Sequence, residues 1–409
     1  MSSPKKWTLE YSPKELYRRK FRMASAKSTL DRKKFEKEFD VTSLNLSQDH
    51  LDIWNQNPHI RQVFANGREF HRENKSLLPS DRILDDNSPM TPYQRRQGEA
   101  KTVEHWGQRK LIMSEIEFLT NYGDPSQSYR VIYAGAAPGT HIYYLSTLFP
   151  NYDFLLVDPS KFTLNETDRI TIIQDFFTDE LAHQCFKESQ ENSQSILFIS
   201  DIRSQIVTMP EKEKEESVIV DMEIQKKWHE IMNPLASMLK FRLPYEDGKT
   251  SYLNGLIYLP VWGGRTTTET RLIVERSQSP SPALQLKEYD HVIYGNMMFH
   301  FNTITRTSYF EHDVIGEGLD HCFDCASEIL ILRIFLKKFP EKAEVLFDSI
   351  SKEIDDSNHP PKRLKLEQSK PNDENFVDLN GDVTMNFLIA KLSKEISQQI
   401  SEKGRTLRP

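Results

Sequence analysis

Short hydrophobic runs recur through the middle of the chain, separated by polar or mixed segments. Those of strand length, rich in Val, Ile, Leu, Phe or Tyr, lie at 131–134, 154–157, 170–173, 196–200, 237–242, 255–260 and 270–275. The first four lack polar alternation, which is typical of parallel strands buried on both faces. Because helical stretches lie between several of them, the pattern predicts an α/β domain with a mostly parallel sheet of about seven strands.

Helical periodicity is clearest on either side of these runs. The segment "GQRKLIMSEIEFLTNYG" (107–123) places apolar residues on one face and indicates a helix that ends near Gly123. Residues 318–350 predict two helices broken at Pro340, and a last helix is expected at 384–403. We therefore expect helical extensions to the sheet domain.

Composition divides the chain into four parts. Residues 1–100 form a basic and polar extension, 101–345 the main domain, 346–380 a linker with a basic segment, and 381–409 a C-terminal helix. The basic stretch within 1–40 is consistent either with an arm on RNA or with a solvated helix.

Charge and cysteine content narrow the function classes. The net charge is -7 over 409 residues, so nucleic-acid binding would require local basic patches. Three cysteines cannot build a disulfide framework, which indicates a reducing compartment. No apolar run reaches about 18 residues and the N-terminus has no apolar signal core, so we expect neither a membrane partner nor secretion.

A glycine-rich loop joins the first predicted strand to a helix in "VIYAGAAPGTHIYYL" (131–145). Gly135 and Gly139 remove Cβ atoms where the backbone turns or approaches a ligand. Their spacing differs from the dinucleotide G-x-G-x-x-G motif and from the lysine-containing P-loop. The next strand ends at Asp158, an acid well placed for a ribose diol. The pattern favours a nucleoside without pyrophosphate, such as S-adenosylmethionine; an ordinary βαβ turn is the alternative.

Five segments in order resemble one known family. They are "GQRKLIMSEIEFL", "APGTH", "ILFISDIRS", "NPLASMLKFRLPY" and "TETRLIV". This combination strongly resembles the poxvirus cap-specific mRNA (nucleoside-2'-O-)-methyltransferases, which also serve as poly(A) polymerase small subunits. The resemblance covers roughly 105–340. It implies the Rossmann-like fold of FtsJ-type ribose methyltransferases, 101–345 as the catalytic domain, and S-adenosyl-L-methionine as cofactor.

The resemblance also implies a catalytic tetrad. Matched motif by motif, it falls on Lys110, Asp201, Lys240 and Glu269. Lys240 is the candidate for activating the ribose 2'-hydroxyl, because a neighbouring ammonium such as Lys110 lowers a lysine pKa. Asp201 and Glu269 would orient the lysines. Taken singly, each of these residues could equally be a surface ion-pair partner.

By the same resemblance, the methyl-donor site would include Gln108, Tyr133, Gly135, Gly139 and Asp158, with Phe176 or Phe177 flanking the adenine. Those two aromatic residues could also be plain core. The chain departs from the family at Ser160, where the poxvirus enzyme has an arginine.

A cap-binding pocket is the third implication. Tyr245 matches an aromatic ring and Asp247 and Asp290 match two acids of the poxvirus pocket, which suits the cationic N7-methylguanosine. A second ring expected just before Glu269 is replaced by threonines 266–268. Three arginines are either phosphate contacts or solvated strand-end residues: Arg203, Arg242 and Arg265.

Two short motifs have weaker meanings. "HCFDC" contains C-x-x-C, but zinc needs four ligands and there is no second pair, so Cys322 and Cys325 are expected in the core. "PPKRLKLE" (360–367) resembles a basic nuclear-import signal and favours a nuclear protein; a viral protein would be cytoplasmic.

The expected activity is transfer of a methyl group from S-adenosylmethionine to a cap-proximal ribose 2'-oxygen of capped mRNA. RNA polymerase or poly(A) polymerase machinery are expected partners. The rival hypotheses are a methyltransferase of uncapped RNA such as rRNA, and a non-catalytic RNA-binding subunit that keeps the fold. A nicotinamide oxidoreductase is disfavoured by the missing dinucleotide motif. The sequence leaves open which cap-proximal nucleotide would be methylated and the oligomeric state.

Overall fold

The computed structural model describes residues 76–94, 106–204, 210–264, 267–276, 284–308, 310–316, 319, 321–356 and 379–405. Two compact units divide this part of the chain, one over Leu78–Arg306 and the other over Thr307–Ser401. The predicted N-terminal basic arm, Arg265 and the 360–367 basic motif lie outside the described residues.

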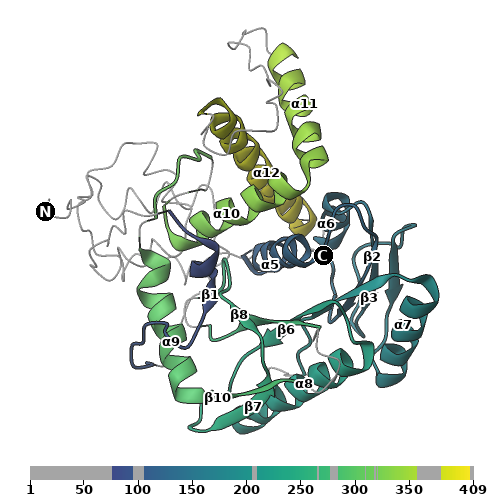
Figure 1. Ribbon diagram of the computed structural model, residues 1–409, viewed down its shortest axis with the longest axis vertical. Coiled ribbons are helices and arrows are strands. Elements are labelled where there is room, and N and C mark those ends of the chain that lie inside the picture. Colours follow the sequence, from purple (N-terminus) through teal and green to yellow (C-terminus); the bar gives the residue numbers. More distant parts are fainter. Residues whose placement is uncertain are drawn as a thin grey trace, which may run out of the picture. The chain divides into compact units, whose positions relative to one another are not determined.

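The first unit is built around a large mixed sheet (Figure 1). Its eight strands are β1 (Ile83–Leu84), β2 (Tyr129–Ala134), β3 (Tyr152–Val157), β4 (Ile170–Ile173), β5 (Ser195–Ser200), β6 (Ala236–Phe241), β8 (Leu256–Tyr258) and β9 (Thr270–Glu275). They are ordered β1-β8-β9-β6-β5-β2-β3-β4. The strands from β4 to β6 are mutually parallel, whereas β9, β8 and β1 pair antiparallel with their neighbours.

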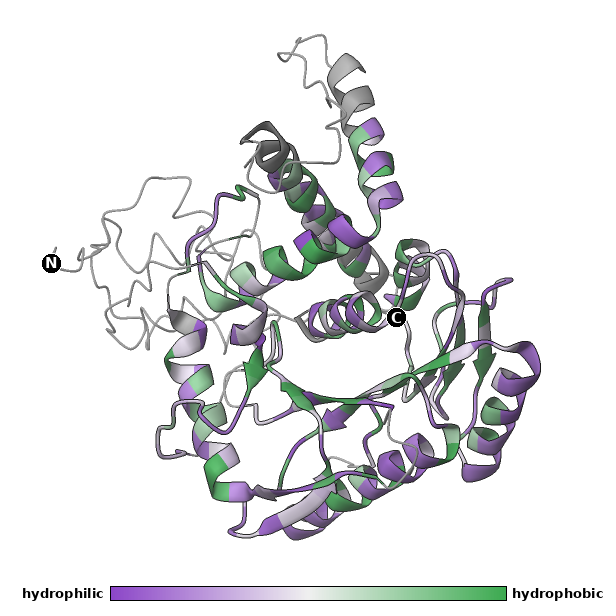
Figure 2. Ribbon diagram, viewed as in Figure 1, coloured by the Kyte–Doolittle hydropathy of each residue, from purple (hydrophilic) through white to green (hydrophobic). Residues whose placement is uncertain are grey.

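The central parallel strands β2, β3, β5 and β6 are mostly hydrophobic and buried because helices cover both faces of the sheet. Figure 1 shows α5 and α6 on one face, with α7 and α8 on the other, and Figure 2 shows the apolar strands between them. The helices of this unit are α5 (Trp106–Tyr122), α6 (Ile142–Leu148), α7 (Asp179–Asn192), α8 (Glu211–Met232) and α9 (His291–Thr303). Two 3-10 turns, Pro79–Arg82 and Thr305–Thr307, lie at the unit's ends.

All seven predicted strands are present, but the expectation of a seven-stranded sheet is wrong, because the sheet has eight. The extra strand, β1, has only two residues and no detectable pattern in the sequence. A separate antiparallel pair, β7 (Lys249–Leu253) and β10 (Leu286–Asp290), was also not predicted. Its sequences "KTSYL" and "LKEYD" are too polar to resemble buried strands.

The second unit is helical over its described residues. It contains α10 (Phe323–Lys338), α11 (Pro340–Asp356) and α12 (Leu379–Arg405). The predicted break at Pro340 is confirmed, and Cys322 and Cys325 are buried as expected for core residues. Among the described helices, none is both long and apolar enough to cross a bilayer.

Candidate active site

The carboxyl ends of β2, β3, β5 and β6 meet at one edge of the sheet because these strands are parallel. Strand β9 runs the other way, so its first residue, Thr270, lies opposite Phe241 at the end of β6. Asp201 directly follows β5, Lys240 precedes the end of β6, and Glu269 directly precedes β9. The topology therefore delivers three candidate catalytic side chains to one edge.

All four predicted tetrad side chains come together there. Lys110, from the first turns of α5, places its Nζ 2.6 Å from Glu269 Oε1. Lys240 Nζ lies 3.0 Å from Asp201 Oδ1 and 3.5 Å from Glu269 Oε2. Glu269 thus connects the two lysines, and Asp201 holds Lys240 from its other side.

Two arginines complete the cluster. Arg271 donates from one guanidinium nitrogen to Asp201 Oδ1 at 2.8 Å and from another to Glu269 Oε1 at 3.2 Å. Arg203 donates to Glu269 Oε2 at 2.7 Å. The Arg271 side chain is 6% exposed and that of Arg203 is 56% exposed, so Arg271 is a buried member of the network and Arg203 lies at its rim. Sequence reasoning missed Arg271.

The cluster shifts the pKa values of its members. Burial, the largest influence, lowers the pKa of Lys110, and the negative charge of Glu269 opposes this. Burial alone would raise the pKa of Asp201, but the positive charges of Lys240 and Arg271 outweigh it and leave a net lowering. Glu269 follows the same logic, with Lys110 foremost among the cations that hold its pKa well below the usual range. Both carboxylates are therefore held ionised.

The glycine-rich loop packs directly against the catalytic edge. Gly135 has φ +81°, and a Cβ there would lie 2.8 Å from the backbone of Asp201 and Ile202. Gly139 has φ +68°, and a Cβ there would meet Leu164 at 2.6 Å. Glycine is thus required at both positions by conformation and by space.

Asp158 joins this loop to β3. One carboxylate oxygen accepts from the Ala137 N–H at 3.2 Å and the other from the Ser160 N–H at 2.7 Å. Each carboxylate oxygen can accept more than one hydrogen bond, so these contacts orient Asp158 without exhausting it.

Gln108 is held in place by Thr140 and His141, which follow the glycine-rich loop. Its Oε1 accepts from Thr140 Oγ1 at 2.7 Å and lies 2.8 Å from His141 Nδ1. The other ring nitrogen of His141 is 2.9 Å from the buried Glu115 carboxylate. The contacts from Thr140 and His141 both use the Gln108 carbonyl oxygen. Among the described residues, the Gln108 amide group has no protein acceptor, so it can donate to a ligand carboxylate. Tyr133 is buried, and burial, aided by the Glu115 charge, raises its pKa well above the usual value.

Phe176 and Phe177 have different environments. Phe177 packs edge-on against Trp228, with ring centroids 4.7 Å apart, and belongs to the core. The suggestion that Phe177 flanks the adenine is therefore corrected: its ring is already enclosed. Phe176 is 70% exposed, so it is the ring of the two that a ligand can reach.

Tyr245 is accompanied by an aromatic residue that sequence reasoning missed. The ring of Tyr93 stacks on Tyr245 with centroids 5.5 Å apart and an interplanar angle of 28°. The Arg242 guanidinium lies 4.4 Å from the Tyr245 ring and pairs with Glu215. Tyr93 is therefore the aromatic neighbour of Tyr245 in the folded chain.

The two acids predicted to bind the cap, Asp247 and Asp290, lie apart from the tetrad contacts. Asp247 is exposed, and Asp290 caps α9 by accepting from the Ile293 N–H at 3.0 Å. Within the part of the chain that the structure describes, neither carboxylate pairs with a tetrad residue.

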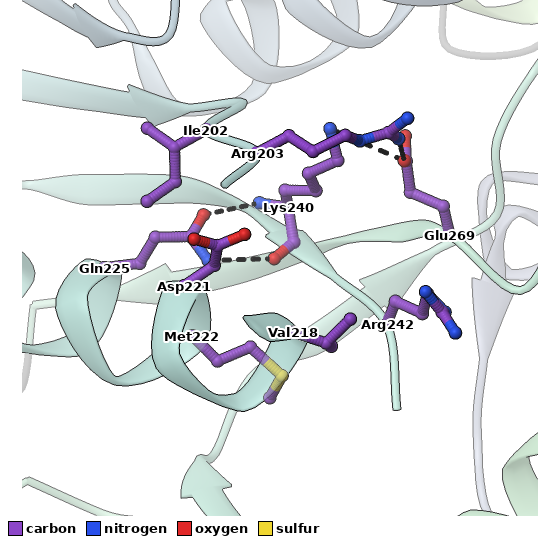
Figure 3. Close-up of a pocket in the computed structure, with 9 residues that line it drawn as sticks. All are labelled: Ile202, Arg203, Val218, Asp221, Met222, Gln225, Lys240, Arg242 and Glu269. Atoms are coloured by element: carbon purple, nitrogen blue, oxygen red, sulfur yellow. Dashed lines mark hydrogen bonds and ion pairs between the residues drawn. The ribbon is translucent and has the colours of Figure 1, made fainter. Parts of the chain in front are cut away.

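A pocket opens beside the tetrad (Figure 3). Four of its lining residues come from α8, and the others lie at the ends of the neighbouring strands. The lining residues are Ile202, Arg203, Val218, Asp221, Met222, Gln225, Lys240, Arg242 and Glu269. Lys240 and Glu269 therefore border open space rather than closed core.

Residues 82–345, more than half of the chain, match the family model described as poly A polymerase regulatory subunit. The chain belongs to this family. Relatives from Fowlpox virus (strain NVSL) and Myxoma virus (strain Lausanne), each named cap-specific mRNA (nucleoside-2'-O-)-methyltransferase, are 27% and 30% identical over 212 and 218 residues. The family-level resemblance inferred from the sequence is confirmed.

The alignments cover only part of each viral relative. They span 49% and 50% of this chain, and 68% and 63% of the Fowlpox and Myxoma proteins. Among solved structures, bluetongue virus VP4, an RNA-capping protein, gives a TM-score of 0.35 at 11% identity, covering 56% of this chain and 39% of VP4. A TM-score that low does not support a shared fold.

Proposed function

We propose that the protein is an S-adenosylmethionine-dependent mRNA cap ribose 2'-O-methyltransferase that acts on a cap-proximal nucleotide. The observation that carries this proposal is the convergence of Lys110, Asp201, Lys240 and Glu269 beside the glycine loop. The names of the viral relatives support the same activity.

The donor site fits S-adenosylmethionine. Gly135 lets the loop pack directly against the backbone of Asp201, Asp158 offers oriented oxygens to a ribose diol, and Gln108 can donate to a carboxylate. Phe176 is exposed and could stack on the adenine. When bound, S-adenosylmethionine supplies an electrophilic methyl group.

The tetrad would act on the acceptor hydroxyl. Lys240 Nζ is fixed between Asp201 and Glu269, so it can hold a ribose 2'-oxygen in one direction. Fixing a nucleophile in the attacking geometry contributes several kcal/mol to rate enhancement, about 7–11 in well-oriented intramolecular reactions. Glu269 also anchors Lys110, the lysine whose pKa is lowered by burial. As the hydroxyl loses its proton to solvent, negative charge develops on the 2'-oxygen, and the lysine side chain held by Asp201 and Glu269 would stabilise that charge by hydrogen bonding.

The Tyr93–Tyr245 stack is the proposed site of cap recognition. Its contact with Arg242 shows that the Tyr245 ring already attracts a cation. An N7-methylated guanine is a delocalised cation and would use the same attraction. Asp247, exposed nearby in sequence, is the carboxylate proposed to accept from the guanine edge.

The test is methyl transfer from labelled S-adenosylmethionine to short RNAs with and without an N7-methyl cap. Lys240→Ala should reduce transfer to a small residual rate. Lys227→Ala is the matched control, because Lys227 pairs with Asp179 on the surface and is 62% exposed. Label on a cap-proximal 2'-oxygen that requires both the cap and Lys240 is the expected result. Equal labelling of uncapped RNA would move the function to general RNA ribose methylation.

The family description favours a second role, as a regulatory subunit of a poly(A) polymerase. In that role the protein would stimulate polyadenylation through RNA binding, and Lys240→Ala would leave the stimulation unchanged. A polymerase assay with both proteins separates this role from the methyl transfer. The basic motif at 360–367 supports a proposed nuclear location, which a fluorescent fusion lacking that motif would test.

A further inference from the structure

Lys240 lies in β6 just beyond the last residue that pairs with the neighbouring strand β5. Strand β5 pairs with β6 only as far as Ser200 opposite Leu239, whereas β9 continues beside Lys240 with Arg271 as its partner. The N–H and C=O of Lys240 therefore extend beyond the β5 ladder. Buried backbone groups of this kind need another partner.

A side chain of α8 fills that role. The Gln225 amide nitrogen donates to the Lys240 carbonyl at 3.1 Å, and its Oε1 accepts from the Lys240 N–H at 3.1 Å (Figure 3). Gln225 is 1% exposed. A primary amide has the donor and acceptor of a peptide unit, so it replaces the missing strand neighbour for one residue.

One helical turn earlier in α8, Asp221 binds the segment that follows Asp201. Its carboxylate accepts from the Ser204 N–H at 3.0 Å and also from the Ser204 hydroxyl. Ser204 is three residues after Asp201, so this contact anchors the segment that carries the catalytic acid. Residues four apart share a helix face, and Asp221 and Gln225 both line the pocket beside Lys240.

Helix α8 is itself fixed from a third direction. The Tyr252 hydroxyl, from β7, donates to the Met222 carbonyl at 2.8 Å, and Tyr252 is fully buried. The turn of α8 that bears Asp221 and Gln225 is thereby tied to β7 of the separate two-stranded pair.

We propose that Asp221 and Gln225 are positioning residues that set the distance between Lys240 and Asp201. The inference rests on the proposed methyl transfer. Neither side chain contacts the reacting atoms; each holds the backbone of a catalytic segment. Displacements of about 1 Å can cost about a hundredfold in rate, so loss of either contact should act mainly on turnover.

The test compares Gln225→Met, which keeps the side-chain volume and removes both hydrogen bonds, with the wild type. We expect kcat to fall about ten- to hundredfold while KM for capped RNA changes less than about threefold. Asp221→Leu, which removes both bonds to Ser204, should show a fall of similar size. Gln184→Met is the control, because Gln184 bonds only to Glu188 on exposed α7 and should leave turnover unchanged.

A double-mutant comparison separates positioning from general loss of structure. In the Lys240→Ala background, Gln225→Met should reduce residual turnover no further, because Gln225 acts through Lys240. A further tenfold fall in that background, or wild-type turnover in Gln225→Met alone, would overturn the proposal.

A second readout does not depend on activity. Lys240 is 15% exposed, and its reductive methylation by formaldehyde, followed by peptide mass spectrometry, should be several-fold faster in Gln225→Met than in the wild type. Equal rates would contradict positioning by Gln225. If the wild type transfers no methyl group, the proposed function fails, while this modification rate still decides the positioning claim.

Discussion

Arg271 gives the sharpest quantitative test of the charge cluster. Replacing it with methionine removes a buried cation that bonds both Asp201 and Glu269. Breaking a buried ion pair by removing one partner typically costs about 3–5 kcal/mol. Here Asp201 and Glu269 would stay buried with the lysines as partners but would lose the hydrogen bonds from Arg271, which places the expected cost at the lower end of that range. The Arg271 side chain is 6% exposed, so little solvent screening reduces this figure.

We therefore expect Arg271→Met to lower the free energy of unfolding by about 3 kcal/mol at pH 7. For a unit the size of Leu78–Arg306, this corresponds to a fall in Tm of about 6–12 °C. Urea unfolding followed by fluorescence, together with differential scanning calorimetry, would measure both quantities.

The effect should depend on pH in a defined direction. Asp201 and Glu269 have lowered pKa values when folded, so their ionised forms stabilise the protein above their unfolded pKa values of about 4. That stabilisation disappears as pH falls through the folded values. The difference between wild type and Arg271→Met should therefore be largest near neutral pH and should narrow below about pH 4.

Arg203→Met is the matched control. Arg203 bonds the same carboxylate, Glu269, but is 56% exposed, so its loss should cost less than about 1 kcal/mol. Equal costs for the two variants, or a cost below about 1 kcal/mol for Arg271→Met, would refute the view that burial gives Arg271 its importance.

Three further outcomes follow from other parts of the first unit and from the cysteines. Burial lowers the pKa of His229 to about 4, so the free energy of unfolding should fall by about 3 kcal/mol as pH drops from about 6.5 to 4. In His229→Gln, urea unfolding at different pH values should show a smaller fall over this range. Thr178→Ala removes the side-chain cap of α7, a bond from the Leu181 N–H, and should cost about 1 kcal/mol in the same assay. Burial raises the pKa of the Cys185 thiol to about 12, and Cys322 and Cys325 are also buried. A thiol reagent at pH 8 should therefore react slowly with the native protein and quickly with all three cysteines after unfolding. Fast labelling of the native protein would contradict this burial.

The central parallel strands were predictable from the sequence because strands buried on both faces consist of consecutive hydrophobic residues. "FLLV" within β3 and "ILFI" within β5 are buried at every position. β7 and β10 left no such record, since their alternating Lys, Thr, Ser and Glu residues face water in a two-stranded pair. β1 is too short for any periodicity to be visible.

The tetrad was predicted by family resemblance, and geometry then added residues that the motifs did not mark. Arg271 had a usable signal, because residues two apart on a strand share a face and Glu269 lies just before β9. Tyr93 had none, since it lies far from Tyr245 in sequence and only the folded chain stacks the two rings. Phe176 and Phe177 are adjacent and chemically identical, so packing alone assigns one to the core and the other to solvent.

Strand β9 lies between β6 and β8 in the sheet but follows both along the chain. During synthesis, β6 therefore emerges from the ribosome before the neighbour that covers its far edge. Until residue 275 has emerged, Lys240 borders an open strand edge that can pair with another chain. A transcript truncated between β8 and β9 should accordingly yield insoluble protein rather than a weakened enzyme.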